Sequence, residues 1–259
     1  MAAVSMMADI GESFGNYRMG DDESILEVIS DANVACGFHA GDPMVMDATV
    51  RACRARGVSV GGHPGFRDLQ GFGRRAITMS RDEIRTDVLY QLGALKAFST
   101  AQGVPLAHVT VHGKMDNIAG VDEMYAGAIV EAVRAFDPEI ILTVQDGELE
   151  RAAKKAGLRI AYTFMADRSY GSDGQPVSRD HPQALLHDPE VVAERALRAA
   201  VDGTIDSIEG TPIAMPCDVV LVHGDNAESV ANAHKVHRRI VDAGIEILPL
   251  SQVLPTRGR

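Results

Sequence analysis

The stretch Val34-Ala35-Cys36-Gly37-Phe38-His39-Ala40-Gly41-Asp42, followed directly by Pro43, decides how the rest of the chain is interpreted. A short apolar run ends at Gly37, and His39 follows two residues later. Asp42-Pro43 is typical of a helix N-cap and the first helical residue, and Gly57 is typical of a helix end. The stretch therefore predicts a strand, an imidazole displayed beyond its carboxyl end, and a helix over 43–56.

The same order of features recurs three times along the chain. Apolar runs lead into His63, His112 and His223, and each of these histidines lies within two residues of a glycine. A single histidine at a strand end is more often structural than functional. Four histidines in the same register, counting His39, indicate a shared pocket.

Strands alternate with helices throughout the 259 residues, with no linker and no change of composition, which predicts one α/β domain spanning 1–259. Seven or so strands with right-handed crossovers favour a closed (β/α) barrel, and an open doubly wound sheet is the alternative. The longest irregular segment, 169–189, is of a length that is usually functional or mobile. The expected strands are 4–8, the one ending at Gly37, 58–63, 108–111, 140–144, 158–165, 219–222 and 245–248; the expected helices are 23–30, 43–56, 80–102, 121–136, 147–156, 189–201 and 227–243.

Charge and cysteine content exclude several classes of protein. With 25 basic and 36 acidic residues the net charge is -11, which argues against a nucleic-acid partner because phosphate binding needs a basic face. Cys36, Cys53 and Cys217 form no C-x-x-C pair and predict no disulfide framework. No signal peptide is evident, and no apolar run approaches the roughly 18 residues of a membrane span. We expect a cytoplasmic protein that does not bind membranes.

Polar side chains gather where the expected strands end. In a barrel the carboxyl ends of all strands meet at one mouth, which is where such folds place their chemistry. These polar residues are Asp9, His39, His63, His112, Asp146, Asp167 and His223.

Two kinds of chemistry suit imidazoles and carboxylates in one cleft. Asp9, His39 and His63 could bind a divalent metal that activates water, or His and Asp could pass protons without a metal. Sequence spacing does not choose between them, because each residue follows a different strand. Glycines beside Arg74 and Arg75 favour either an anion site or a plain turn. The chain lacks H-E-x-x-H, G-x-S-x-G and G-x-x-x-x-G-K-[ST] motifs.

Five segments make the chain resemble the LamB/YcsF family, over nearly its whole length. The first two are highly specific: D-I-G-E-S-F-G and N-V-A-C-G-F-H-A-G-D-P. The other three are G-H-P-G-F, G-F-G-R-R and V-H-G-D. The segments span 9–15, 33–43, 62–66, 71–75 and 222–225. The resemblance implies a barrel related to the polysaccharide deacetylases.

The resemblance also implies a function, namely hydrolysis of 5-oxoproline to L-glutamate driven by ATP with Mg²⁺, together with two partner subunits of B and C type. For this function we expect, from side-chain chemistry, the catalytic residues Asp9, Glu12, His39, His63, His112 and Asp167, with Asp9 and His39 for the acid–base work. The residues we expect to bind substrate or phosphate are Asp42, Arg74, Arg75, Asn117, Arg168, His223 and Asp225.

The chain departs from the family pattern at a few strand positions. Ser5, Met7 and Ala8 stand where the first strand usually has Asp, Asn and Cys in D-L-N-C-D-L-G-E. The usual K-P-H-G-A-L-Y-N segment has Thr110 and Asp116 in place of its Lys and Tyr, and Thr163 replaces a Glu.

Two alternative functions remain open from the sequence. One is a metal-dependent, ATP-independent amide hydrolase or deacetylase on the same barrel. The other is a non-catalytic paralogue that binds B- and C-type subunits. Self-association into a homo-oligomer is compatible with either.

Overall fold

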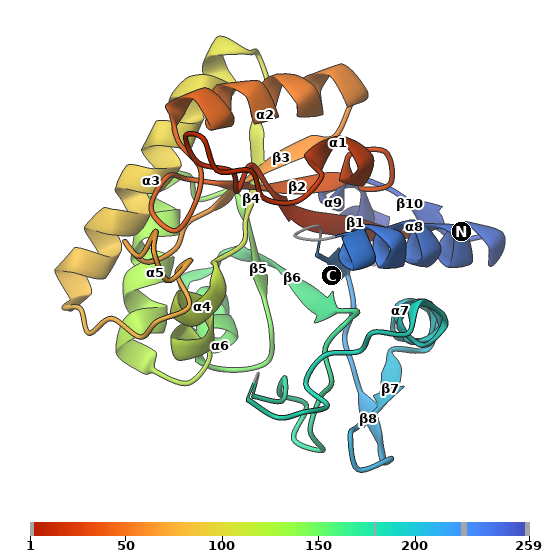
Figure 1. Cartoon of the computed structure of the whole chain (residues 1–259). Helices are drawn as coiled ribbons and strands as arrows, with labels where there is room; N and C mark the ends of the chain where they lie inside the picture. The colour runs from red at the N-terminus through yellow and green to blue at the C-terminus, as the bar shows by residue number, and fades with distance from the viewer. Residues whose placement is uncertain (1–2, 179, 224–226, 257–259) are drawn as a thin grey trace.

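The computed structural model describes residues 3–178, 180–223 and 227–256, in which seven parallel strands close into a barrel (Figure 1). The ring runs β1-β2-β3-β4-β5-β6-β9, and β9 pairs with both β6 and β1. This confirms the expected barrel and excludes the open sheet, which would have two unpaired edges. The strands are β1 (Ala3–Ile10), β2 (Asp31–Ala35), β3 (Ser59–His63), β4 (Leu106–Val109), β5 (Ile141–Val144), β6 (Arg159–Met165) and β9 (Val219–Val222).

Helices connect the strands and cover the outside of the barrel (Figure 1). The last of them is different, because side chains of α9 pack with residues that fill the barrel interior. The helices are α1 (Asp22–Ile25), α2 (Pro43–Arg56), α3 (Arg81–Ala101), α4 (Gly113–Ala119), α5 (Glu123–Phe136), α6 (Glu148–Ala156), α7 (Pro189–Asp202), α8 (Ala227–Asp242) and α9 (Leu250–Thr256).

The local signals around α2 and α3 are confirmed. The Asp42 carboxylate accepts a hydrogen bond from the Val45 amide at 2.9 Å, and Gly57 ends α2 with a φ of 70°. At the start of α3, Ser80 and Glu83 form a reciprocal capping box. Residues at the ends of these helices therefore set their limits, as the sequence predicted.

Short elements differ from the expectation. The helix expected over 23–30 is only α1, because the chain extends early and enters β2 at Asp31. The strand expected over 245–248 is the two-residue β10 (Glu246–Ile247), which pairs with β1 outside the closed ring. Helices α4 and α9 and the antiparallel hairpin of β7 (Thr204–Asp206) and β8 (Pro212–Ala214) were missed. Each is too short to show a hydrophobic period.

β1 contributes side chains to two separate cores. Val4 and Met6, with their alternate neighbours, pack outward against the helices, whereas Met7 packs inside the barrel. Both faces of a parallel strand are buried, which explains the nearly continuous apolar run. The inner core is small and consists of Met7, Ile141, Ala161, Val219, Leu221, Leu250 and Leu254.

The long irregular segment lies beside the barrel mouth. Tyr170 is buried, and its hydroxyl accepts a hydrogen bond from the Met165 amide at 2.9 Å, which ties the segment to the end of β6. Bridges between Arg168 and Leu185 and between Tyr170 and Pro176 fold it back on itself. Its central residues line the cavity described below.

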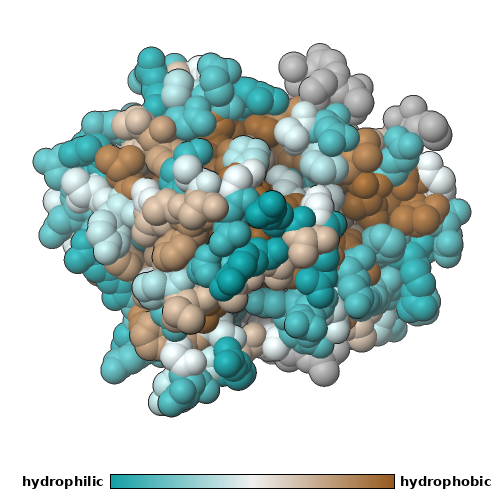
Figure 2. Space-filling model, turned by 90° about the horizontal axis from the view of Figure 1, so that it is seen from above, coloured by the Kyte–Doolittle hydropathy of each residue, from teal (hydrophilic) through white to brown (hydrophobic). Residues whose placement is uncertain are grey.

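The described surface offers no helix long and apolar enough to cross a membrane. Hydrophilic side chains dominate the outline of the face in Figure 2, with hydrophobic side chains gathered in patches between them. This mixture fits the acidic, strongly charged composition.

The closest approach between neighbouring strands yields a stability prediction. Gly61 of β3 pairs with His108 of β4, and a Cβ on Gly61 would lie 2.1 Å from the His108 ring. Gly61→Ala is expected to destabilise the protein by about 3 kcal/mol through overpacking. Gly93→Ala in α3, where a Cβ meets nothing within 4 Å, is expected to stabilise it by about 0.5–1 kcal/mol. Urea unfolding of both variants checks this, and equal midpoints would contradict the described packing.

Candidate active site

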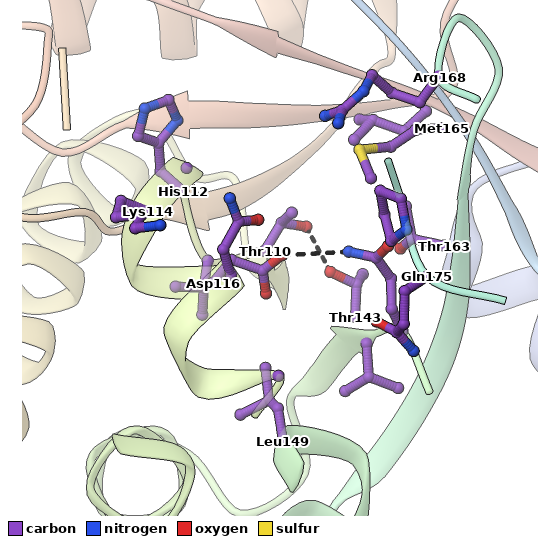
Figure 3. Close-up of a pocket in the computed structure, with 18 of the residues that line it drawn as sticks. Thr110, His112, Lys114, Asp116, Thr143, Leu149, Thr163, Met165, Arg168 and Gln175 are labelled. Carbon is purple, nitrogen blue, oxygen red and sulfur yellow. Dashed lines mark hydrogen bonds between the residues drawn. The ribbon is translucent and has the colours of Figure 1, made fainter. Parts of the chain in front are cut away.

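A cavity of about 530 Å³ opens at the carboxyl ends of the strands (Figure 3). Side chains from the residues that follow β4 and from α4 form one side, and side chains from β6 and the segment after it face them (Figure 3). The structure brings seven of the expected site residues into this wall: Asp9, His63, Arg74, His112, Asn117, Arg168 and His223.

Five other expected residues, all in the described part of the chain, do not line the cavity: Glu12, His39, Asp42, Arg75 and Asp167. Glu12 and His39 are buried next to His112, so they adjoin the wall from behind. Asp42 caps α2 and also accepts from the Gly15 amide, and Arg75 pairs with Asp68.

Two further residues complete this comparison. Asp167 hydrogen-bonds His223. Asp225 lies outside the described residues.

Asp9 is held at the mouth of the barrel by contacts to both of its carboxylate oxygens. Its Oδ1 accepts a 2.9 Å hydrogen bond from Asn33 Nδ2, and its Oδ2 lies 3.4 Å from His63 Nε2. Burial raises the pKa of the Asp9 carboxyl, but the charge of His63 and the hydrogen bond to it outweigh burial and lower the pKa below its usual range. Asp9 is therefore an ionised base at neutral pH.

His63 is oriented by the backbone. Its Nδ1 lies 2.7 Å from the Thr110 carbonyl oxygen, so Nδ1 carries a proton and Nε2 faces Asp9 and His112. Burial lowers the pKa of His63, but the negative charge of Asp9 prevails and raises it. The contact between them thus lowers the pKa of the Asp9 carboxyl and raises the pKa of the His63 imidazole.

His112 is fixed by the loop that carries the G-F-G-R-R motif. His112 Nε2 donates to the Phe72 carbonyl oxygen at 2.8 Å, and Phe72 has a left-handed φ of 54°. A non-glycine residue in that region marks backbone strain of a kind found at functional sites. Burial, and then the charge of His63, lower the pKa of His112 to about 3, so the ring is neutral. Arg74, from the same loop, reaches the cavity.

Glu12 and His39 form a second buried pair. His39 Nε2 lies 3.3 Å from Glu12 Oε1, and the His39 ring stacks on His112 with centroids 3.7 Å apart. Burial, followed by the charge of Asp9, raises the pKa of Glu12 to about 8. Burial and the neighbouring imidazoles lower the pKa of His39.

The cluster suited to a metal differs from the expected Asp9, His39 and His63. One ligand atom from each of Glu12, His39, His63 and His112 lies within 4.8 Å of the others. Asp9 stands beside this group, next to His63. The spacing of residues along the sequence could not reveal this group of four, because they come from the ends of four different strands.

Neutral polar side chains line the side between β4 and β6 (Figure 3). Thr110 accepts a 2.8 Å hydrogen bond from Thr143, and Asp116 accepts one of 3.2 Å from Gln145. Thr163 is buried, and its hydroxyl has no hydrogen-bond partner among the residues that the structure describes. Sequence reasoning missed Thr143, although a hydroxyl inside an apolar strand was a usable signal.

Arg168 and His223 stand at the opposite rim. Arg168 donates to the carbonyl oxygens of Val177 and Ala184, which holds its side chain against the long segment. His223 Nδ1 lies 2.6 Å from Asp167 Oδ2. Burial raises the pKa of Asp167, but His223 outweighs it and lowers the pKa. The expected Ala166-Asp167-Arg168 motif therefore orients the rim of the cavity.

Asp116 yields a prediction about pH. Its burial raises the pKa from 3.8 to about 7, so the folded protein binds a proton there that the unfolded chain has lost between roughly pH 4 and 7. Its contribution to stability is present below pH 4 and declines as pH rises to 7. Asp116→Asn should therefore be more stable than the parent at pH 8, by at most about 4 kcal/mol, with no advantage at pH 4.

Urea unfolding at both pH values measures this difference. Asp146→Asn is the matched control, since Asp146 also lines the cavity but is exposed. A gain for Asp116→Asn that is the same at both pH values would contradict the assignment.

Comparison with known proteins agrees with this architecture. The LamB/YcsF family model matches residues 4–255. A protein from Natranaerobius thermophilus, named as the A subunit of 5-oxoprolinase, is 43% identical over 251 residues, covering 96% of this chain and 98% of that protein. One of the same name from Symbiobacterium thermophilum is 45% identical and covers 94% of each.

Solved structures with the same fold are also found. The lactam utilization protein from Thermus thermophilus superposes with a TM-score of 0.92 at 41% identity, covering 95% of this chain and 99% of that one. The T48 deacetylase superposes with a TM-score of 0.50 at 15% identity, a likeness of fold alone. On the family match and the full-length identity to its relatives, the chain belongs to the LamB/YcsF family.

Proposed function

We propose that this chain is the A-type component of an ATP-dependent 5-oxoprolinase, which hydrolyses the lactam of 5-oxoproline to L-glutamate together with B- and C-type subunits. Relatives that cover almost the entire chain are named as the A subunit of 5-oxoprolinase. The observation that carries the proposal is the Asp9 carboxylate 3.4 Å from His63 in the wall of the cavity, with His112 3.0 Å from the same His63 nitrogen.

This arrangement supplies the proton transfers that lactam opening requires. Water must attack the carbonyl carbon, and the ring nitrogen must gain a proton as its bond to that carbon breaks. Asp9 is ionised and suited to accept the proton from water, whereas His63 has the raised pKa of a proton donor. One group is set up as base and its neighbour as acid, which is the pattern expected of an acid–base site.

Cationic side chains suit the anions involved. Arg74 and Arg168 both line the cavity, on different walls. Guanidinium groups match carboxylate and phosphate geometry. We assign Arg168 to the substrate carboxylate and Arg74 to phosphate, with Asn117 nearby in the wall.

ATP, with Mg²⁺, supplies the driving force in this proposal. An amide is a poor electrophile, and phosphorylation of its oxygen would create a leaving group. This chain has no P-loop motif. We therefore assign to it the lactam site, with the B- and C-type subunits needed for the complete reaction.

Co-expression with candidate B- and C-type subunits tests the function. Glutamate release from 5-oxoproline should require ATP and all three chains. Asp9→Asn, which keeps the shape of the side chain, should lower kcat by about 10²–10⁴-fold because it removes the base. Arg74→Gln should raise KM for ATP or slow turnover at least tenfold, by loss of a charge-assisted contact.

Arg75→Gln is the matched control. Arg75 neighbours Arg74 in the chain but is exposed and pairs with Asp68 outside the cavity. It should leave turnover within about twofold of the parent. Hydrolysis without ATP would favour a metal-dependent amide hydrolase. An assembled but inactive complex would favour a non-catalytic role.

A further inference from the structure

We propose that Glu12, His63 and His112 bind one divalent transition-metal ion, and that His39 positions the Glu12 carboxylate. Three of the four residues follow the ends of β1, β2 and β4, and His63 ends β3, so adjacent strands of the barrel supply them. Their candidate ligand atoms all lie within 4.8 Å of one another. All four residues are buried, so the candidate metal site lies in the interior of the protein.

The protons on the two cavity-side histidines are fixed by their backbone partners. His63 Nδ1 faces the Thr110 carbonyl oxygen at 2.7 Å, and His112 Nε2 faces the Phe72 carbonyl oxygen at 2.8 Å. A carbonyl oxygen only accepts, so each of these nitrogens must carry a hydrogen. In neutral rings the lone pairs are then on His63 Nε2 and His112 Nδ1.

Those two lone pairs point at each other. His63 Nε2 and His112 Nδ1 are 3.0 Å apart, with no hydrogen available between two neutral rings. Oxygens of Asp9 and Glu12 lie 3.4 Å from His63 Nε2 and 3.9 Å from His112 Nδ1 respectively. These four atoms repel one another unless a proton or a metal ion lies among them. The proton would be on His63 or on the Glu12 carboxyl, whose pKa is raised by burial. The alternative is a metal ion.

The donor set and its spacing favour a metal ion. Tetrahedral zinc with bonds of about 2.0–2.1 Å holds its ligand atoms about 3.3 Å apart. The separations of 3.0 and 3.9 Å around His112 Nδ1 bracket that value. Metal-bound histidines characteristically donate their other ring N–H to a carbonyl or carboxylate, and both His63 and His112 do so.

His39 is assigned a positioning role by its stacking. Its ring lies parallel to His112, with 6° between the planes and 3.7 Å between the centroids. One ion cannot lie in both ring planes, so His39 and His112 cannot both bind it well. His39 Nε2 instead faces Glu12 Oε1 at 3.3 Å, which orients the carboxylate toward the other two ligands.

The three ligands leave a coordination position free. His63, His112 and Asp9 line the cavity, whereas Glu12 does not, so the free position faces the cavity and Asp9. A bound ion there would lower the pKa of a water molecule within reach of the Asp9 carboxylate. Imidazole and carboxylate ligands suit Zn²⁺, Co²⁺, Mn²⁺ and Fe²⁺.

Direct binding measurements test the proposal on the full chain, after removal of any histidine tag. The chelator-treated protein should take up one equivalent of Zn²⁺, measured by elemental analysis and calorimetry. Co²⁺ should give the visible absorption of a histidine-bound ion. His112→Ala and Glu12→Gln should each weaken Zn²⁺ binding at least tenfold, since each removes a ligand.

His181→Ala is the control, because His181 is an exposed histidine that does not line the cavity. It should bind Zn²⁺ like the parent. Circular dichroism identifies any variant that has failed to fold, and His63→Gln provides a second ligand variant. No stoichiometric uptake by the parent, together with a His63 ring that nuclear magnetic resonance shows doubly protonated at neutral pH, would overturn the proposal in favour of a held proton.

The metal proposal does not rest on the assigned reaction. It excludes His63 as the proton donor when the ion is bound, because His63 Nε2 cannot bind an ion and carry a proton at the same time. Zinc uptake without glutamate formation would support the ion and count against the oxoprolinase. Glutamate formation by a complex whose A-type chain binds no ion would do the reverse.

Discussion

The hydrogen bonds of Asp31 hold the barrel interior together. Asp31 is fully buried, and its Oδ2 accepts from Ser5 Oγ, from Ser30 Oγ and from the Leu250 amide. One carboxylate thereby joins β1, the entry to β2 and the start of α9. A buried carboxylate is costly unless it is hydrogen-bonded, so these three donors must be in place for the barrel to close in this way.

The same carboxylate connects to the mouth of the barrel. Asp31 Oδ1 lies 3.8 Å from His108 Nδ1, His108 Nε2 lies 2.9 Å from Asn33 Oδ1, and Asn33 Nδ2 donates to Asp9. Buried polar groups in such a chain fix one another's orientation. The position of Asp9 in the cavity is therefore set from inside the barrel by Asn33 and His108, and Gly61, which has no side chain, leaves room for the His108 ring.

Much of the fold could be predicted because its signals are local. The caps of α2 lie in or next to the elements they limit, so Asp42 and Gly57 marked that helix correctly. The closed ring followed from the alternation of strands and helices. The extent of β2 could not be predicted, because Asp31 and Asn33 look like loop residues until partners from β1 and β4 surround them. Tertiary hydrogen bonds there override local propensity.

Many residues of the candidate site could be predicted from the sequence, but their arrangement in space could not. Residues at strand ends were expected to meet, and His63, His112 and Asp9 do. What sequence could not distinguish is which side chains face the cavity and which stand behind it. Glu12 and His39 lie behind because the His39 ring stacks on His112, a contact between loops that follow β2 and β4.

Two of the positions at which this chain departs from the family pattern lie inside the barrel. By its resemblance to the family, the chain has Thr110 and Thr163 at positions where a Lys and a Glu are usual, and both threonines are buried in the cavity wall. Hydroxyls therefore replace two charged side chains, and the Thr110 hydroxyl accepts a hydrogen bond from Thr143. The chain thus keeps its histidines and Asp9 along β1 to β4 and has threonine hydroxyls in the wall between β4 and β6. The reactive groups and these hydroxyls line one cavity, so changes among the hydroxyls alter what the site admits without disturbing the groups that act on it.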